Sequence, residues 1–159
     1  MSTPTTPYTP DLAGREPLQA MRDTAVRIAG IVATWTPAQF ERSYAPGKWS
    51  ARLILIHLAQ AELALGYRAR MALTVPNYTA QSFDQDDWLA KERDLSGRDA
   101  ALSFATLSKM NVELFSKLSP ADRLLTLSHP EYGALTVDWV IHHMAGHQIH
   151  HLKHFEVIA

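Results

Sequence analysis

Near its C-terminus the chain reads VDWVIHHMAGHQIHHLKHFEVI, residues 137–158. Apolar residues recur in this stretch every three or four positions, which is the period of an amphipathic helix. Thr136 stands where an N-cap hydroxyl is expected, and Asp138 falls in the first turn, where the helix dipole stabilises a negative charge. The stretch therefore predicts a long helix that buries one face.

Three earlier segments show the same period, at about 17–35, 50–73 and 99–118. Pro17 suits a first helical turn, and Ser50 is a plausible N-cap. Residues 124–127 and 133–135 flank a turn and predict a small extended excursion. No sustained strand pattern or internal repeat occurs. We expect an all-α four-helix bundle with a short extra helix, about Asp84 to Arg93, or a loop between the second and third long helices.

The order of the helices is less constrained than their number. An antiparallel bundle is the natural packing of four such helices, but the connections are long enough for crossovers, so both arrangements stay open. We expect residues 1–15 to form an extended N-terminal lead-in and residues 16–159 to form a single domain.

Composition limits the partners. The 15 Lys and Arg nearly balance the 16 Asp and Glu, so the chain offers no field for a nucleic-acid backbone. The longest apolar run, 53–56, is too short to cross a membrane, and no secretory signal is visible, so we expect a cytoplasmic protein. Cysteine is absent, which excludes disulfides and thiolate metal sites.

Histidine is concentrated in one place: six of the eight histidines lie between His142 and His154. On a helix, residues four apart share a face, so His143, His147 and His151 form one ridge. Two imidazoles at this spacing can hold one cation. By spacing alone the pairs 143–147 and 147–151 are equally good, and 150–154 is a third candidate on another face.

A metal site in a bundle core also needs a ligand from a facing helix. His57 lies in an apolar stripe with Leu53 and Ala61, so we expect it to point inward and to need a polar partner. Three neutral imidazoles would leave a divalent ion with an open position, as in catalytic sites. The simpler interpretation is a hydrogen-bonded core histidine and a solvated histidine-rich face. We expect that solvated face at His142, His150 and His154.

Four stretches, taken in order, resemble a known family. They are PGKWSAR at 46–52, HLAQAE at 57–62, FDQDDW at 83–88 and GHQIHHL at 146–152. The chain is similar to the DinB-like (YfiT-type) metal-dependent hydrolases, which include thiol S-transferases. The resemblance implies a four-helix bundle, commonly a homodimer, that binds one zinc, nickel or similar ion. Carried over by position, the ligands are His57, His147 and His151, with His143 as a neighbour.

Such a site lowers the pKa of bound water or ionises a thiol cosubstrate, so a hydrolase or a thiol S-transferase acting on a small molecule is expected. Carboxylates that could move a proton are Glu62, Asp84 and Asp87, with Asp86 beside them. Glu62 falls about 140° around the helix from His57, too far for co-ligation, so we expect a surface or interface charge. Asp84 is equally suited to capping a helix.

Two basic residues near the start of the second helix, Lys48 and Arg52, could hold a cosubstrate carboxylate, but solvated rim charges are the simpler expectation. The competing class of protein is a non-catalytic bundle in which the histidines form a metal store, a sensor or a structural site. A di-iron bundle is disfavoured because the Glu-x-x-His pairs that it needs are absent from the sequence.

Overall fold

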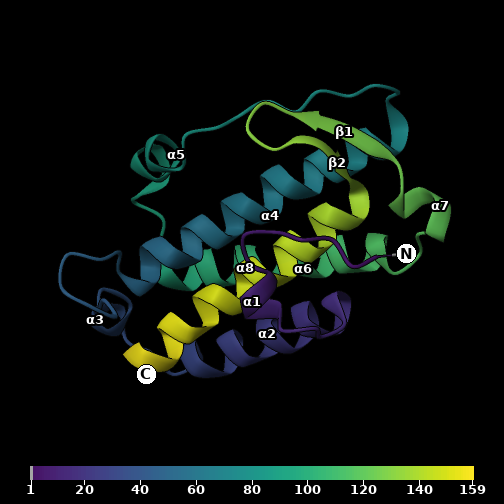
Figure 1. Cartoon of the computed structure of the whole chain (residues 1–159). Helices are drawn as coiled ribbons and strands as arrows, with labels where there is room; N and C mark the ends of the chain where they lie inside the picture. Colours follow the sequence, from purple (N-terminus) through teal and green to yellow (C-terminus); the bar gives the residue numbers. More distant parts are fainter. Residues whose placement is uncertain (1) are drawn as a thin grey trace.

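The computed structural model describes residues 2–159; Met1, the first residue of the expected lead-in, lies outside them. Four long helices dominate the fold, as Figure 1 shows. They are α2 (Pro17–Val32), α4 (Ala51–Thr74), α6 (Gly97–Phe115) and α8 (Val137–Ile158). Shorter elements connect them: α1 (Thr9–Leu12), α3 (Pro37–Phe40), α5 (Gln85–Glu92), α7 (Pro120–Arg123), β1 (Thr126–His129) and β2 (Gly133–Thr136). The expected four-helix bundle with a short helix after the second long helix is confirmed.

The order of the helices around the bundle differs from a simple antiparallel one. Both α2 and α4 pack against α6 and α8, so α2 and α4, consecutive along the chain, lie diagonally across the bundle. Neighbours α4 and α6 run in the same direction, as do α2 and α8 (Figure 1). The reason is the connection at 75–96, which returns along the bundle before α6 begins. That crossover brings α8 antiparallel to α4.

The helix N-caps that the sequence suggested are present in the structure. The hydroxyl of Ser50 accepts a hydrogen bond from the Leu53 amide, and Thr136 does the same for Trp139. Asp84 caps α5 by accepting from two backbone amides of its first turn. These side chains satisfy amides that have no partner within their helices, which fixes where α4, α5 and α8 begin.

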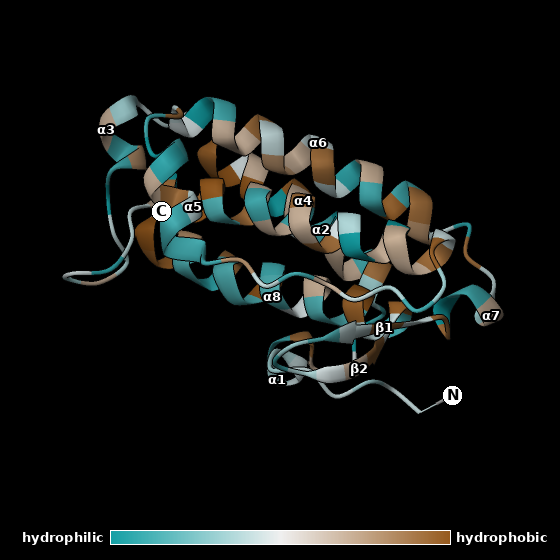
Figure 2. Cartoon of the chain, turned by 90° about the horizontal axis from the view of Figure 1, so that it is seen from above, coloured by the Kyte–Doolittle hydropathy of each residue, from teal (hydrophilic) through white to brown (hydrophobic). Residues whose placement is uncertain are grey.

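The core is divided into two apolar clusters. One contains Phe115 and the first half of α8, and the other contains Phe104, Phe155 and the first half of α4. Figure 2 shows hydrophobic and hydrophilic residues alternating along the long helices, as amphipathic helices require. Between the clusters lies a layer of buried polar side chains from three helices. Its members are His57 and Glu62 of α4, Ser108 and Asn111 of α6, and His147, Gln148 and His151 of α8.

A β-hairpin and the N-terminal segment cover α8 on one side of the bundle (Figure 2). The loop after α4 joins the hairpin through a bridge between Thr79 and Ser128. The lead-in, expected to be extended, contains the one-turn helix α1. It is fastened to α8 by the Trp139 indole, which donates to the Thr5 carbonyl, and by an ion pair of Asp11 with Lys153.

Gly146 of α8 makes the contact with the N-terminal segment possible. A Cβ at this position would lie 2.6 Å from the Tyr8 carbonyl oxygen, which is closer than van der Waals contact allows. Glycine is therefore required here by packing, although it lowers helix propensity. The lead-in sits on α8 because this one position carries no side chain.

Gly30 of α2 is the contrasting case, because nothing lies within 4 Å of an added Cβ. We expect Gly30→Ala to raise the free energy of unfolding by about 0.5–1 kcal/mol, since alanine loses less backbone entropy in a helix. Gly146→Ala should instead lower it, because the methyl group collides with Tyr8. Urea denaturation of both variants checks the pair, and a stabilising Gly146→Ala would contradict the packing.

Across residues 2–159, no helix combines the length and the apolar character needed to span a bilayer.

Candidate metal centre

Three histidines converge between α4 and α8. The Nε2 atom of His147 lies 2.9 Å from Nε2 of His57 and 3.1 Å from Nε2 of His151. All three side chains are buried, at 5–7% exposure. His147 and His151 are one turn apart on α8, and the antiparallel packing of α4 presents His57 to both. His57 and His147, which are 90 residues apart in the sequence, are thus in contact in the fold.

The three imidazoles are neutral near pH 7. Burial lowers the pKa of His57 to about 4. Burial also lowers the pKa of His147 and of His151, and the neighbouring imidazoles lower both further. Neutral imidazole is the form that binds metal ions, because it keeps a lone pair on one ring nitrogen.

The donor set fits a metal ion. Three imidazole nitrogens facing one another cannot all be satisfied by hydrogen bonds, since a neutral ring carries only one N–H. A tetrahedral ion with metal–nitrogen bonds of 2.0–2.1 Å separates its ligand nitrogens by about 3.3 Å, close to the two distances seen here. The three ligand atoms lie within 4.8 Å of one another. One cation would accept all three lone pairs.

A fourth histidine supports this cluster from outside. The Nδ1 atom of His151 lies 3.2 Å from Nδ1 of His154, whose ring stacks on Tyr44 with 3.9 Å between centroids. A partner on the far nitrogen fixes the orientation and tautomer of a ligating imidazole. His150, His151 and His154 form a second group close enough to share an ion, but only His151 of these is buried. We therefore assign His154 an orienting contact.

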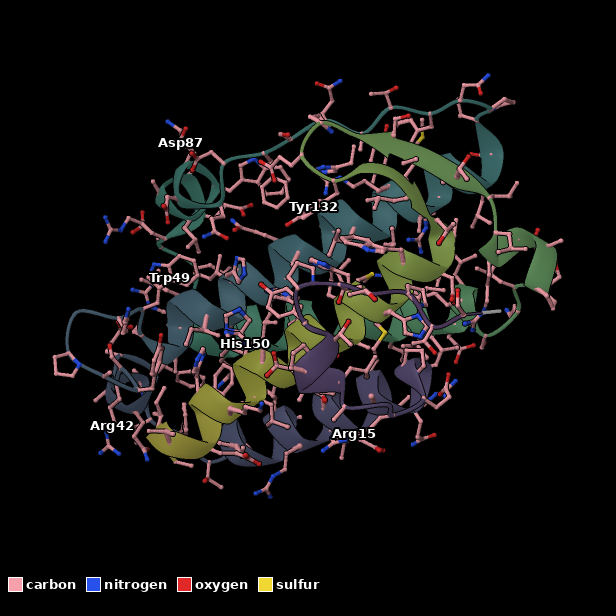
Figure 3. The ribbon with its side chains drawn as sticks, in the orientation of Figure 1. Arg15, Arg42, Trp49, Asp87, Tyr132 and His150 are labelled. Carbon is pink, nitrogen blue, oxygen red and sulfur yellow. The ribbon has the colours of Figure 1, made fainter. Side chains whose placement is uncertain are left out.

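A cavity of about 210 Å³ opens beside the cluster, between α4, α8, the hairpin and the loop after α4. His57 and His147 line it, and Arg68 enters from α4. Figure 3 places Tyr132 beneath the hairpin, on the side of α4 and α8. The other aromatic lining residues are Tyr8, Phe83, His129, Trp139 and His143. The cluster is therefore open on one side to a small aromatic chamber.

The candidate carboxylates lie elsewhere. Asp84 is exposed and caps α5, while Asp86 and Asp87 are exposed on that helix, where Figure 3 shows Asp87 at the outer surface. None of the three lines the cavity. Among the described residues, the one carboxylate that does is Glu131, at the exposed tip of the hairpin.

Glu62 was expected at a surface or an interface, and that expectation was wrong. Its side chain is 3% exposed and points toward α6, where Asn111 donates to one carboxylate oxygen at 2.9 Å. Gln148, next to His147, donates to the other oxygen at 2.5 Å and also to Ser108. The angular position of Glu62 around α4 correctly predicted that its side chain points away from the three histidines. Its burial depends on α6, which the local sequence of α4 does not specify.

The three histidines expected on a solvated face, His142, His150 and His154, are partly buried instead. His142 is half-buried, with its Nδ1 2.9 Å from the Asp138 carbonyl oxygen. His150 lies 3.5 Å from Asp11, beside α1, as Figure 3 shows. His143 stacks on Trp139 at 4.7 Å, and burial lowers its pKa to about 4. The N-terminal segment and the hairpin cover a face of α8 that its sequence alone suggests is open to solvent.

Several cavity residues were missed by the sequence reasoning, and Tyr8 and Arg68 are two of them. Arg68 follows His57, Ala61 and Leu65 at helical spacing, so extending the stripe would have placed it on the same face. Tyr8 carries no such signal. Its ring lies 5.1 Å from that of His147 only because the N-terminal segment folds back onto α8.

The fold and the buried polar layer together define a helical bundle of a known kind. Residues 20–155 match the DinB superfamily, and the chain belongs to that family. It is 31% identical over 117 residues, 73% of this chain and 68% of the relative, to a protein of Oceanobacillus iheyensis named "Putative metal-dependent hydrolase". A protein of Bacillus mycoides with the same name is 26% identical over 86% of this chain and 80% of its own.

A solved structure shares the fold. YfiT from Bacillus subtilis, described as a probable metal-dependent hydrolase with an unusual four-helix bundle topology, superposes with a TM-score of 0.82. The match covers 99% of this chain and 90% of YfiT at 17% identity. The diagonal placement of α2 and α4 described above is therefore part of a fold shared with a solved structure. The resemblance inferred from the four sequence stretches is confirmed.

Proposed function

We propose that His57, His147 and His151 hold one divalent metal ion and that the protein is a metal-dependent enzyme acting on a small molecule. The observation that carries this proposal is the convergence of three neutral imidazole nitrogens, two of them on residues that line a cavity. Three protein ligands would leave a position for substrate, as catalytic sites require. The names of the relatives, metal-dependent hydrolases, support the same conclusion.

A bound ion of this kind supplies a nucleophile at neutral pH by lowering the pKa of water or of a thiol. The surrounding residues favour a thiol cosubstrate. Hydrolysis usually requires a nearby carboxylate to move protons, and Glu131 at the exposed hairpin tip is the lining candidate among residues 2–159. A thiol, with a pKa near 8.5, needs less help to ionise. The absence of cysteine leaves no protein thiol to compete.

The protein's own residues would then bind and orient the reactants. The neutral histidines leave the full charge of the ion in place, and the aromatic walls exclude water from the side of the hairpin. The resemblance further suggests zinc or nickel as the ion, a homodimer and a cytoplasmic location, and these stay predictions.

Elemental analysis of untagged protein tests the proposal. We expect about one divalent ion per chain after incubation with zinc or nickel and removal of excess metal. A polyhistidine tag must be absent because it binds nickel itself. Protein that holds no ion under these conditions would contradict the proposal.

The rates of two reactions then separate a thiol transferase from a hydrolase. Metal-loaded protein should join a small thiol to an alkyl halide, with release of the halide ion, faster than it hydrolyses an activated ester. Faster ester hydrolysis would identify a hydrolase.

A further inference from the structure

The cavity beside the histidine cluster contains one buried cation, Arg68 of α4. Its side chain lines the cavity, and the residue is 9% exposed. The Nη2 atom donates to the Gln81 carbonyl at 2.5 Å, and the guanidinium lies 5.6 Å from the Phe83 ring centroid. These two contacts hold the head group at the cavity wall but use only part of its five N–H donors.

Arg68 is the one buried arginine among residues 2–159, and it has no acidic partner. Arg52 pairs with Glu41, and Arg123 pairs with Asp138. Between residues 2 and 159, Arg68 forms no ion pair with a carboxylate. Glu131 shares the cavity but is exposed at the hairpin tip. A buried guanidinium without a carboxylate is costly, so the site is suited to an anion supplied from outside.

The position of Arg68 sets the size of that anion. Arg68 and His57 are eleven residues apart on α4, a rise of about 16 Å along the helix axis. Helical side chains lean toward the N-terminus, so the guanidinium approaches the histidines and leaves a span on the order of 10 Å. Phe83, Tyr132 and Trp139 line this space. A small molecule with a flat or apolar body and a terminal carboxylate matches the charge, the length and the walls.

We propose that Arg68 binds the carboxylate of a small aromatic or apolar acid whose opposite end reaches the histidine cluster. The inference rests on the proposed function, because it assigns the anchor of the substrate or thiol cosubstrate that reacts there. The planar guanidinium can donate two parallel hydrogen bonds to a carboxylate, which orients as well as binds it. Arg52 cannot take this role, since its guanidinium is already paired with Glu41. Lys48 is exposed just before α4 and lies outside the cavity.

Paired probes that differ only in charge test the anchor. Cobalt-loaded protein is titrated with para-(mercaptomethyl)benzoate and with its neutral amide, and the thiolate-to-cobalt absorption reports binding. We expect the carboxylate to bind about tenfold or more tightly than the amide, as a charge-assisted pair allows. Arg68→Met, which keeps an unbranched apolar side chain at this position, should reduce that ratio to about one without changing the affinity of the amide or the cobalt content.

Arg22→Met is the matched control, because Arg22 is exposed on α2 and the substitution changes the net charge equally. It should keep the tenfold preference. The same ratio is measured on metal-free protein with para-toluate and para-toluamide, by changes in tryptophan fluorescence. A preference there without cobalt binding would leave the anchor standing and overturn the metal proposal. Equal binding of acid and amide by the wild type, or an undiminished preference in Arg68→Met, would overturn the anchor.

Discussion

His147→Ala should weaken zinc binding by about two orders of magnitude or more. A structural zinc site with four ligands binds with roughly 10–16 kcal/mol, so one ligand accounts for about 3 kcal/mol, or more than a hundredfold in affinity. His147 is the member of the cluster whose Nε2 lies close to both of the others. Its loss therefore removes the ligand that contacts both of the other imidazoles. His57→Ala should have a comparable effect.

Thermal unfolding with and without zinc measures the change. An ion that binds only the folded chain stabilises it by about 2.7 kcal/mol at a free concentration one hundred times the dissociation constant. Wild-type protein should show that rise in melting temperature, and His147→Ala should not. Circular dichroism of the metal-free variant establishes that it still folds despite the small cavity that the substitution leaves.

Two histidines of the same helix provide the controls. His142 contacts Asp138 and lies outside the cluster, so His142→Ala should respond to zinc as the wild type does. His154 contacts the far nitrogen of His151, so His154→Ala should still bind one ion but about tenfold more weakly. An equal response to zinc in all four variants would rule out the three-histidine assignment.

The sequence specified the helices better than their order. Capping residues and apolar period placed α4 and α8 within about one residue of their observed ends, because those signals are local. The parallel placement of α4 and α6 depends on the path of residues 75–96, which carries no comparable signal. Crossover connections are set by packing at a distance.

The candidate site shows the same division. The stripe of Leu53, His57 and Ala61 correctly predicted that His57 is buried in the bundle. The choice among the histidine pairs of α8 required the family resemblance, and metal binding itself stays a prediction. Tyr8 reaches the cavity only through the docking of the N-terminal segment at Gly146. Such contacts arise from segments far apart in sequence, and helical period does not encode them.

Glu62→Gln should make the protein progressively more stable than the wild type as the pH rises. Burial raises the pKa of the Glu62 carboxyl from 4.5 to about 7, although hydrogen bonds from Asn111 and Gln148 oppose the shift. The folded protein therefore holds this proton more tightly than the unfolded chain. The stabilisation is fully present below about pH 4.5 and is lost as the pH rises through 7. The loss amounts to about 3 kcal/mol.

Glutamine cannot ionise, so the variant does not undergo that loss. The difference in free energy of unfolding, variant minus wild type, should increase by about 3 kcal/mol between pH 4.5 and pH 8. Taking the difference cancels the titration of the buried histidines, which both proteins share. Its value at pH 4.5 reports only how well an amide replaces a neutral carboxyl. The side-chain amide oxygen of Gln148, Oε1, has no hydrogen-bond partner and is available to accept from the new amide.

Urea denaturation of chelator-treated protein at several pH values measures this difference, and Glu113→Gln is its matched control. Glu113 is exposed on α6, so the same chemical change there tests whether the rise with pH depends on burial of the carboxyl. A flat difference for Glu62→Gln would mean that the carboxyl ionises in the core as readily as in water. Water or a cation would then have to reach the polar layer from the side of Asn111, where Arg70 donates to the amide oxygen at 2.7 Å. A difference that rises with pH would instead establish that Glu62 stays a neutral acid near pH 7. Its hydrogen-bond partner Gln148 is the residue next to His147 in the sequence.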